Sequence, residues 1–237
     1  MKPIYKRVLL KLSGEGLMGD KSFGMSPEVL QNLAQQIKII HKSGVDVCVV
    51  VGGGNIFRGA KEAAKGMNRT VADQVGMLAT LMNALCLQNA LESNGVDTRV
   101  LSGLSVPQAC ENYMYRRALR HLEKKRVVIF AGGTGNPYFT TDTGAVLRAS
   151  EMQCEAVLKA TQVDGVYTSD PKLDPKAERL QNITYDEVIQ KQLKVMDLTA
   201  VALAKENNIP ILVFSQHEDD SLENIVQGKG VFTIIQK

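Results

Sequence analysis

Short apolar runs alternate with helix-like segments along the whole chain. The runs 6–12, 45–51 and 126–130 are rich in Val, Leu and Ile. The second of them is a continuous β-branched stretch, which is typical of a strand buried on both faces. Between these runs, apolar residues recur at helical spacing over 26–43 and 70–93. The alternation predicts βαβ units and a largely parallel sheet between two helix layers.

The rest of the chain continues the same pattern. Further strands are predicted at 98–101, 157–159, 211–214 and 230–235, and further helices at 108–122, 142–152, 184–191, 197–207 and 221–227. A hairpin-type turn at Asp164-Gly165, together with the last strand, predicts some antiparallel pairing. The 237 residues contain no long linker, internal repeat or low-complexity tract. One compact chain with two lobes is therefore expected.

The segment 70–93 is apolar around most of its circumference, unlike an ordinary surface helix. One stripe is formed by Val71, Val75, Leu78, Met82 and Leu85, and it is widened by Met77, Leu81 and Leu87. A helix of this kind is buried on two sides. We therefore expect one side to pack on the sheet and the other to suit a subunit contact.

Composition excludes several classes of function. Hydrophobic residues make up 44% and charged residues 22% of the chain, which is ordinary for a globular protein with a full core. The net charge of +3 is too weak to argue for a nucleic acid or a membrane as the main partner. No apolar stretch approaches a membrane span, and Lys11 interrupts the first apolar run, as no secretory signal would. A cytoplasmic protein is expected.

Cysteine and histidine residues give no sign of a metal site or a disulfide framework. The cysteines are far apart and form no C-x-x-C pair, and the histidines show no ligand spacing. They are Cys48, Cys86, Cys110 and Cys154, and His41, His121 and His217. Reduced, mostly buried thiols are expected, and no bound metal.

Three of the apolar runs end in glycine-rich turns, at 13–16, 52–55 and 131–137. Consecutive backbone N–H groups in such turns form anion-binding nests. If the runs are parallel strands, the turns share the edge of the sheet at which α/β proteins bind ligands. Three such turns suggest more phosphate than one nucleotide carries.

The first glycine turn matches two familiar motifs only superficially. Gly14 to Gly19 has the G-x-G-x-x-G spacing of a dinucleotide site, but residues 20–24 intervene before the next helix, which that motif should open directly. The same stretch has the glycine spacing of a P-loop, but Asp20 stands where its lysine should be. Neither site is predicted.

Two cations accompany the first two turns. Lys11 lies inside an apolar strand, two residues before a glycine turn, and a buried ammonium needs an anionic partner. A ligand phosphate is the favoured partner, with a lysine that snorkels to water at the sheet rim as the alternative. Arg58 follows the triplet Gly52-Gly53-Gly54 and either forks onto phosphate oxygens or is simply solvated.

The stretch 134–142 combines hydroxyls, an amide and two aromatic rings just before a predicted helix N-terminus, where free N–H groups bind anions. It is suited to reading a base and its phosphate together. Asp142 either holds Lys11 in place, binds Mg²⁺ indirectly, or caps the helix. Asp73, placed in the first turn of helix 70–93, either accepts ribose hydroxyls or complements the helix dipole, and the sequence alone favours the dipole.

Five segments together resemble the bacterial uridylate (UMP) kinases, which belong to the amino-acid kinase fold family and are unrelated to P-loop kinases. They are Lys11-Leu12-Ser13-Gly14-Glu15, residues 52–59, Gly133 to Pro137 with Thr140-Thr141-Asp142, Lys159-Ala160-Thr161 with Val163 to Tyr167, and Lys194-Val195-Met196-Asp197. The resemblance spans essentially the whole chain. It implies an α/β three-layer αβα sandwich with a central, mainly parallel twisted sheet of about eight strands.

The resemblance also implies an activity: Mg²⁺-dependent transfer of the γ-phosphoryl group of ATP to UMP, in pyrimidine nucleotide biosynthesis. Residues 1–155 would bind the phosphate acceptor and residues 156–237 would bind ATP, within a single domain. By matching position, the ATP-binding residues would be Lys11, Leu12, Ser13, Gly14, Gly54, Arg58, Thr161, Tyr167 and Asp170. The UMP-binding residues would be Gly53, Asp73, Thr134, Gly135, Asn136, Pro137, Tyr138, Phe139, Thr140 and Thr141.

The resemblance assigns catalytic roles to Lys11, Arg58, Asp142 and Lys159, with Asp142 orienting the lysines. It further implies a homohexamer activated by GTP and inhibited by UTP. Gln88 and Glu92 occupy positions where relatives carry basic residues that help to bind GTP, so Arg99, Tyr115 and Arg126 are the allosteric candidates here. Two alternatives remain: a kinase of a small carboxylate or carbamate, and a non-catalytic sensor of uridine nucleotides.

Overall fold

The computed structural model describes residues 2–59, 64–169, 173–174, 176–193, 195–216 and 221–237. The strands are β1 (Arg7–Leu12), β2 (Asp46–Val51), β3 (Thr98–Ser102), β4 (Glu111–Asn112), β5 (Val127–Ala131), β6 (Ala156–Thr161), β7 (Val166–Tyr167), β8 (Arg179–Leu180), β9 (Asn182–Thr184), β10 (Ile211–Ser215) and β11 (Thr233–Gln236). The helices are α1 (Pro27–Lys42), α3 (Arg69–Ser93), α4 (Tyr115–Glu123), α5 (Thr141–Glu151), α6 (Tyr185–Gln190), α7 (Leu198–Asn207) and α8 (Ser221–Val226), with a short 3₁₀ helix at Glu15–Leu17.

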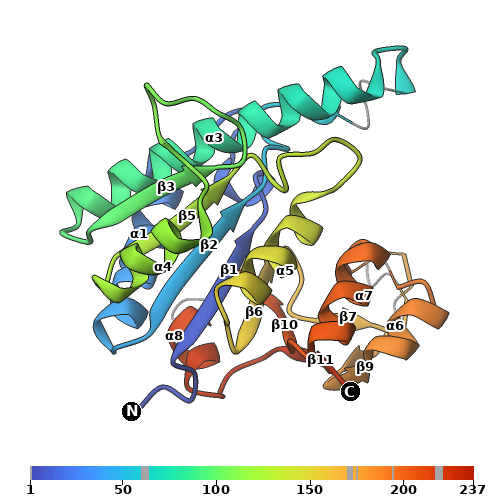
Figure 1. Cartoon of the computed structure of the whole chain (residues 1–237). Coiled ribbons are helices and arrows are strands. Elements are labelled where there is room, and N and C mark those ends of the chain that lie inside the picture. The colour runs from blue at the N-terminus through green and yellow to red at the C-terminus, as the bar shows by residue number, and fades with distance from the viewer. Residues whose placement is uncertain (1, 60–63, 170–172, 175, 194, 217–220) are drawn as a thin grey trace.

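The described strands form one large sheet of nine, in the order β4-β3-β5-β2-β1-β6-β10-β11-β9, and β7 and β8 pair separately. The pairs in the large sheet are parallel except β10 with β11, so β11 and β9 run against the other seven. The chain starts at β1 in the middle, builds outward through β2, and crosses to the other side of β1 at β6 (Figure 1). Such a reversal opens a crevice at the carboxyl ends of the central strands.

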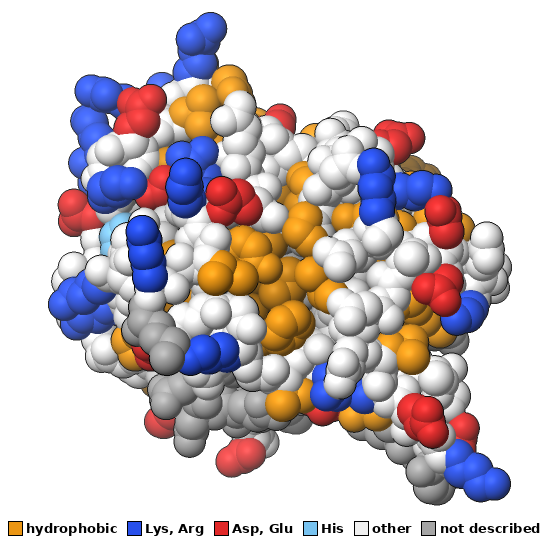
Figure 2. All heavy atoms as spheres, turned by 90° about the horizontal axis from the view of Figure 1, so that it is seen from below, with side chains coloured by type: hydrophobic (Ala, Val, Ile, Leu, Met, Phe, Trp, Pro, Cys, Tyr) orange, Lys and Arg blue, Asp and Glu red, His pale blue; other side chains and the backbone are white. Residues whose placement is uncertain are grey.

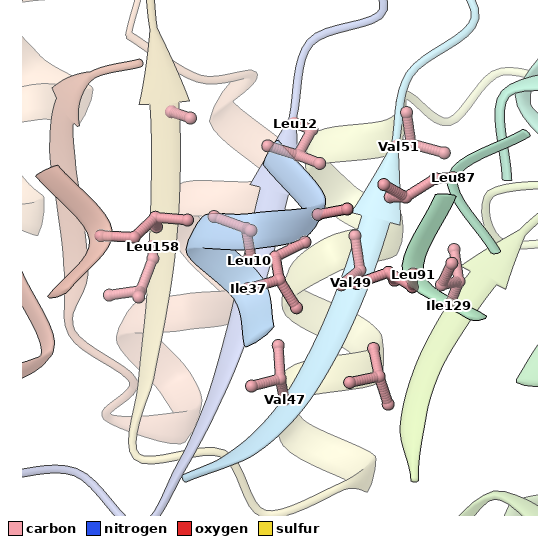
Figure 3. Close-up of a cluster of buried hydrophobic side chains, with 14 of the residues drawn as sticks. Leu10, Leu12, Ile37, Val47, Val49, Val51, Leu87, Leu91, Ile129 and Leu158 are labelled. Carbon is pink, nitrogen blue, oxygen red and sulfur yellow. The ribbon is translucent and has the colours of Figure 1, made fainter. Parts of the chain in front are cut away.

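Helices cover both faces of the sheet, as the alternating pattern predicts. On one face α1, α3 and α8 pack on side chains such as Leu10, Val49 and Leu158, as Figure 3 shows for α1 and α3. On the other face α4, α5, α6 and α7 pack on the residues that alternate with these, such as Leu9, Val50 and Val157. The expected three-layer αβα sandwich is confirmed, with nine strands in place of about eight.

Two local predictions are wrong. The helix expected at 108–122 begins only at Tyr115, because Glu111 and Asn112 pair with the edge of the sheet as β4 and the Tyr113 N–H donates to the Ser102 carbonyl at 2.8 Å. The turn at Asp164-Gly165 joins no hairpin. It precedes β7, which pairs antiparallel with β8 across a longer connection. The antiparallel pairing expected of the last strand is confirmed in β11.

Helix α3 is the long helix that runs across the top of Figure 1. By length and composition it is the one helix among the described residues that could cross a membrane, contrary to the sequence expectation. Its inner side, including Leu81, Leu87 and Leu91, is buried against the sheet and α1. On its outer side Leu78 and Met82 are 46% and 52% exposed, so the second buried side that we expected is open in the single chain.

The amino ends of the strands form the opposite end of the molecule from the glycine turns. Figure 2 shows this face, where apolar side chains gather in the middle and Lys and Arg side chains lie around the border. The candidate site lies at the other end of the molecule, with the glycine turns at the carboxyl ends of the strands.

Candidate functional site

The three glycine turns lie together at the carboxyl ends of β1, β2 and β5, as the sequence predicts. β1 and β2 pair in register to their last residues, and the Gly52 N–H donates to the Leu12 carbonyl at 2.9 Å. The backbones of the first two turns touch: a Cβ atom added to Gly14 would lie 2.8 Å from both the Gly52 oxygen and the Gly54 nitrogen. Only glycine permits this approach.

Two lysines from neighbouring strands share one carboxylate beside these turns. Lys11 on β1 and Lys159 on β6 are direct partners in the register of the sheet. The Lys159 ammonium donates to Asp142 Oδ2 at 2.7 Å, and Lys11 Nζ lies 2.6 Å from Asp142 Oδ1 as an ion pair. The expectation that Asp142 holds Lys11 is met, whereas the helix cap of α5 is Thr140.

Two ammonium groups share one direct carboxylate partner in this cluster. Lys11 and Lys159 are each only 8% exposed and both pair with Asp142, while the charge of Asp197 adds a weaker attraction on Lys159. Burial alone would raise the pKa of Asp142, but the charges of Lys11 and Lys159 outweigh it and hold this pKa below its ordinary value. Burial, aided by the like charge of Lys11, lowers the pKa of Lys159 to about 8 although Asp142 opposes the shift. Two buried ammonium groups that share one direct carboxylate partner suit an anionic ligand.

Arg58 reaches back to the first glycine turn. Its guanidinium pairs with the carboxylate of Glu15, and its Nε donates to the Gly54 carbonyl at 3.3 Å. About two fifths of each of the two side chains is exposed, so a phosphate can replace Glu15 without a large rearrangement. The cation predicted to follow the second turn therefore lies at the junction of the first and second turns.

A pocket of about 150 Å³ lies between the second turn, the third turn and α3. Six of the ten residues predicted to bind UMP line it: Gly53, Asp73, Thr134, Phe139, Thr140 and Thr141. Gly135, Asn136, Pro137 and Tyr138 do not, and Tyr138 is 67% exposed. Phe57, Met77 and Thr80 complete an apolar side of the pocket that carries one hydroxyl.

Asp73 points across this pocket to the third turn. Its Oδ2 accepts from the Tyr138 N–H and from Arg69 Nε, both at 2.8 Å. Because α3 begins at Arg69, Asp73 lies past the first turn of the helix, and complementation of the helix dipole does not explain its position. The interpretation that the sequence alone favoured is wrong, and the carboxylate instead lines the pocket.

The described residues predicted for the adenosine end lie at the end of β6 and in β7. Thr161 ends β6 and its hydroxyl bonds to Val163, and the Tyr167 hydroxyl donates to Asp164 at 2.6 Å. Asp170 lies outside the described residues. Leu12 is buried and lines a larger cavity of about 420 Å³ behind β1, between α1 and Phe214, whereas Ser13 stands half-exposed in the turn itself.

The three allosteric candidates do not form one cluster. Arg99 and Arg126 lie at the amino ends of β3 and β5, away from the site, where Arg99 contacts Glu92 and Arg126 contacts His121. Tyr115 begins α4, shortly after the carboxyl end of β4, and is 43% exposed.

The sequence predicted no role for three polar residues that organise the site, although Asp197 belongs to one of the five motifs. Asp197 accepts hydrogen bonds from Thr140, Thr143 and the Ala200 N–H, and so ties the third turn to α7. Thr80 and Asn83 project from the buried side of α3. A signal for the last two was available, because they interrupt an apolar helix at a spacing of three residues.

Among the described residues, no three His, Cys, Asp or Glu side chains are grouped as a protein metal site would require. The carboxylate nearest the lysines is Asp142, and both of its oxygens face ammonium groups. These residues suit a cation that arrives with phosphate oxygens as its main ligands, as Mg²⁺ does with nucleotides.

Comparison with known proteins shows which family the chain belongs to. The model of the amino acid kinase family matches residues 6–215. The chain belongs to this family. Within it, the chain is 56% identical to the uridylate kinase of Cereibacter sphaeroides, over 98% of the chain and 94% of the relative. It is 58% identical to the uridylate kinase of Hyphomonas neptunium, over 98% of the chain and 93% of the relative.

Solved structures agree with the family. The UMP kinase of Bacillus anthracis superposes with a TM-score of 0.94 at 39% identity, covering 98% of this chain and 96% of that one. The UMP kinase of Ureaplasma parvum gives 0.93 at 39% identity, covering 98% and 99%. The fold, the family and a kinase activity follow from these similarities, and the resemblance to the bacterial uridylate kinases drawn from the five motifs is confirmed.

Proposed function

We propose that this amino acid kinase family member transfers the γ-phosphoryl group of ATP to UMP and releases ADP and UDP. The observation that carries the proposal is the pair Lys11 and Lys159, in register on β1 and β6, sharing the single carboxylate of Asp142 beside three glycine turns. The names of the close relatives, which are uridylate kinases, support UMP as the acceptor.

In this proposal the two substrates meet end to end across the glycine turns. The acceptor nucleotide occupies the pocket lined by Gly53, Asp73 and Thr134, with Asp73 accepting the ribose hydroxyls. ATP lies on the side of the C-terminal lobe, with its phosphates on the turn 13–16 and on Lys11 and Arg58. Residues 1–155 would thus bind the acceptor and residues 156–237 most of the donor.

The chemistry asks for positioning and charge neutralisation rather than a protein nucleophile. The acceptor phosphate is already ionised at neutral pH, so no general base is needed. Lys11, Lys159 and Arg58 lie where negative charge builds up between donor and acceptor, and Asp142 holds the two lysines in place. Mg²⁺, held by the ATP phosphates, would neutralise further charge on the transferred group.

A kinase of a small carboxylate or carbamate is the nearest alternative. The pocket argues against it, because Phe57, Met77 and Phe139 give it an apolar wall suited to a flat base, while Asp73 repels a small anion. A non-catalytic sensor of uridine nucleotides is the second alternative. The buried lysine pair argues against it, since binding alone does not require two cations facing one another across neighbouring strands.

The test is a coupled assay of ADP release with ATP and Mg²⁺ and one acceptor at a time. UMP is expected to be phosphorylated far faster than CMP, dUMP or N-acetylglutamate. Equal turnover of CMP would reject the assigned base specificity, and preference for N-acetylglutamate would establish the carboxylate kinase. Tight UMP binding by calorimetry without any turnover would establish the sensor.

Regulation and assembly belong to the same proposal. UTP is expected to inhibit by occupying the UMP pocket, and GTP to activate through a separate site. The exposed apolar side of α3, with Leu78 and Met82, supports assembly into the expected homohexamer. In the cell, the proposed enzyme acts in the cytoplasm, in pyrimidine nucleotide biosynthesis.

A further inference from the structure

Helix α3 holds the second and third glycine turns through two buried polar side chains. Thr80 and Asn83 are 3% and 0% exposed and stand three residues apart, on the side of the helix that faces the sheet. α3 packs against both β2 and β5, the strands that lead into these turns (Figure 1). Buried polar side chains in an otherwise apolar contact need bonded partners.

Asn83 is bonded to the second turn. Its Nδ2 donates to the Gly52 carbonyl at 2.6 Å and to Asn55 Oδ1 at 2.7 Å. Asn55 Nδ2 donates back to Asn83 Oδ1 at 3.0 Å and to the Gly24 carbonyl at 2.8 Å. This reciprocal amide pair fixes both ends of the glycine triplet to the helix.

Thr80 is bonded to the third turn. Its hydroxyl accepts from the Gly132 N–H at 2.8 Å and donates to the Met77 carbonyl at 2.7 Å. Gly53 of the second turn lies against the same helical turn, because a Cβ atom added there would come within 2.8 Å of Ala79 Cβ and 3.0 Å of the Thr80 nitrogen. One turn of α3 thus sets the spacing between the two glycine turns.

We propose that Thr80 and Asn83 are positioning residues, which fix the distance between the second turn, whose backbone touches the turn proposed to hold the ATP phosphates, and the third turn, which lines the acceptor pocket. The inference rests on the proposed function, because it assumes that phosphate passes between ligands held by these turns. Neither side chain acts on the reacting atoms. A shift of the third turn against the second misaligns the acceptor with the donor phosphates, while ATP keeps its contacts at the first turn and UMP keeps its contacts at the third.

The hydroxyl of Thr80 can be removed without changing the shape of the side chain. Thr80→Val is expected to lower kcat by about tenfold or more while the KM values for ATP and UMP stay within about threefold, as expected for lost alignment. Thr80→Ser, which keeps the hydroxyl, is expected to recover most of the lost turnover. Thr98→Val is the matched control, because Thr98 is 0% exposed and its hydroxyl donates to the Val96 carbonyl far from the site.

A second measurement needs no nucleotide. Hydrogen exchange of the Gly132 amide, followed by mass spectrometry of the peptide over β5 and the third turn, is expected to speed up in Thr80→Val and not in Thr98→Val. If Thr80→Val does not fold, Asn83→Ala carries the same kinetic test, with faster exchange expected over residues 52–57.

Several outcomes would overturn the inference. They are a Thr80→Val enzyme with kcat within about twofold of the original, a loss that appears wholly as raised KM, or an equal loss in Thr98→Val. If the unaltered chain does not phosphorylate UMP, the proposed function fails by itself. The turnover comparison is then made with the acceptor that the chain does phosphorylate, and the exchange experiment is unaffected.

Discussion

The ammonium of Lys159 donates a hydrogen bond of 2.7 Å to the carboxylate of Asp142, from a strand next to the one that carries Lys11. This bond is buried, and it keeps a lysine charged at neutral pH although desolvation weakens the hold on its proton. The site therefore carries a cation whose charge depends on pH in an accessible range.

Turnover is expected to fall on the alkaline side because of Lys159. Its pKa is lowered to about 8 in the free enzyme, so the ammonium is lost as the pH rises through that value. The pH profile of kcat/KM reports the free enzyme, so it should fall on the alkaline side with a midpoint near pH 8. The pH profile of kcat reports the enzyme with bound substrates, whose phosphates stabilise the ammonium, so its alkaline limb should lie at higher pH. Steady-state kinetics between pH 6 and pH 10, on the order of ten points, would measure both.

The control is Lys159→Arg, whose guanidinium stays charged throughout. The limb near pH 8 should disappear in this variant even if turnover is reduced. The pH dependence of stability provides an independent check, because the folded chain releases the Lys159 proton more easily than the unfolded chain. The free energy of unfolding therefore gains a contribution as the pH rises from about 8 towards 10.5. An unchanged alkaline limb in Lys159→Arg would assign it to another group.

Lys11→Ala is expected to abolish most turnover while UMP still binds. The ammonium lies beside the first glycine turn, so its loss removes charge stabilisation worth a factor of about 10²–10³ in kcat. Asp142 then keeps Lys159 as its partner, and no unpaired carboxylate is buried. Calorimetry of UMP binding alongside the kinetics separates the two effects.

Lys11→Met tests packing, because it keeps the length of the side chain within β1 but not its charge. Lys125→Ala serves as the surface control, since that ammonium pairs with Asp46 and is 68% exposed. Normal turnover in Lys11→Met would remove Lys11 from the mechanism.

The layers of the fold were predictable because burial on both faces of a parallel sheet leaves a direct mark on the sequence. Continuous β-branched runs such as 45–51 occur for that reason. The edge strand β4 leaves no such mark. Its two residues pair only through backbone groups, so the surrounding helical pattern over 108–122 misled the prediction.

The site could be predicted from the sequence where its residues stand out among their immediate neighbours. Lys11 is conspicuous as a charge inside an apolar strand, and glycine triplets are conspicuous in themselves. Asp73 was misjudged because its role depends on where α3 begins and on the Tyr138 N–H, 65 residues away. The role of Asp197 was not predicted for the same reason, because its partners Thr140 and Thr143 lie 57 and 54 residues away in the sequence.

Asp73→Asn is expected to weaken the acceptor site selectively. An amide keeps one acceptor oxygen but loses the charge that pairs with Arg69 and that would favour two ribose hydroxyls. The KM for UMP should rise by about tenfold or more, whereas the KM for ATP stays nearly constant, because binding to one substrate is lost. The preference for UMP over dUMP should shrink at the same time.

Asp46→Asn is the matched control for this experiment. That carboxylate also accepts from cations, Arg7 and Lys125, but it lies at the amino end of β2, away from the site. Its loss should cost stability without changing either KM. A larger effect of Asp73→Asn on ATP than on UMP would move Asp73 out of the acceptor site.

The outer side of α3 should control the size of the assembly. Leu78 and Met82 are exposed by about half, four residues apart on one stripe of the helix, with Val71 also 45% exposed. Charges placed there would have to be buried without partners in a subunit contact, which is costly. The double variant Leu78→Glu and Met82→Glu is expected to lower the mass measured by light scattering from that of the proposed hexamer to that of a smaller species.

The variant should stay folded, because neither residue contributes to the buried side of the helix, and its thermal unfolding reports this directly. Ile39→Glu on α1, where Ile39 is 40% exposed, is the control for an exposed apolar residue elsewhere, and it should leave the mass unchanged. Thr80 and Asn83 lie on the opposite side of α3 from this stripe. Loss of a subunit contact on the outer side is therefore expected to loosen the packing of the helix that holds the second and third glycine turns. A smaller species with reduced kcat would link assembly to catalysis through α3, and a variant of unchanged mass would place the subunit contact on another surface.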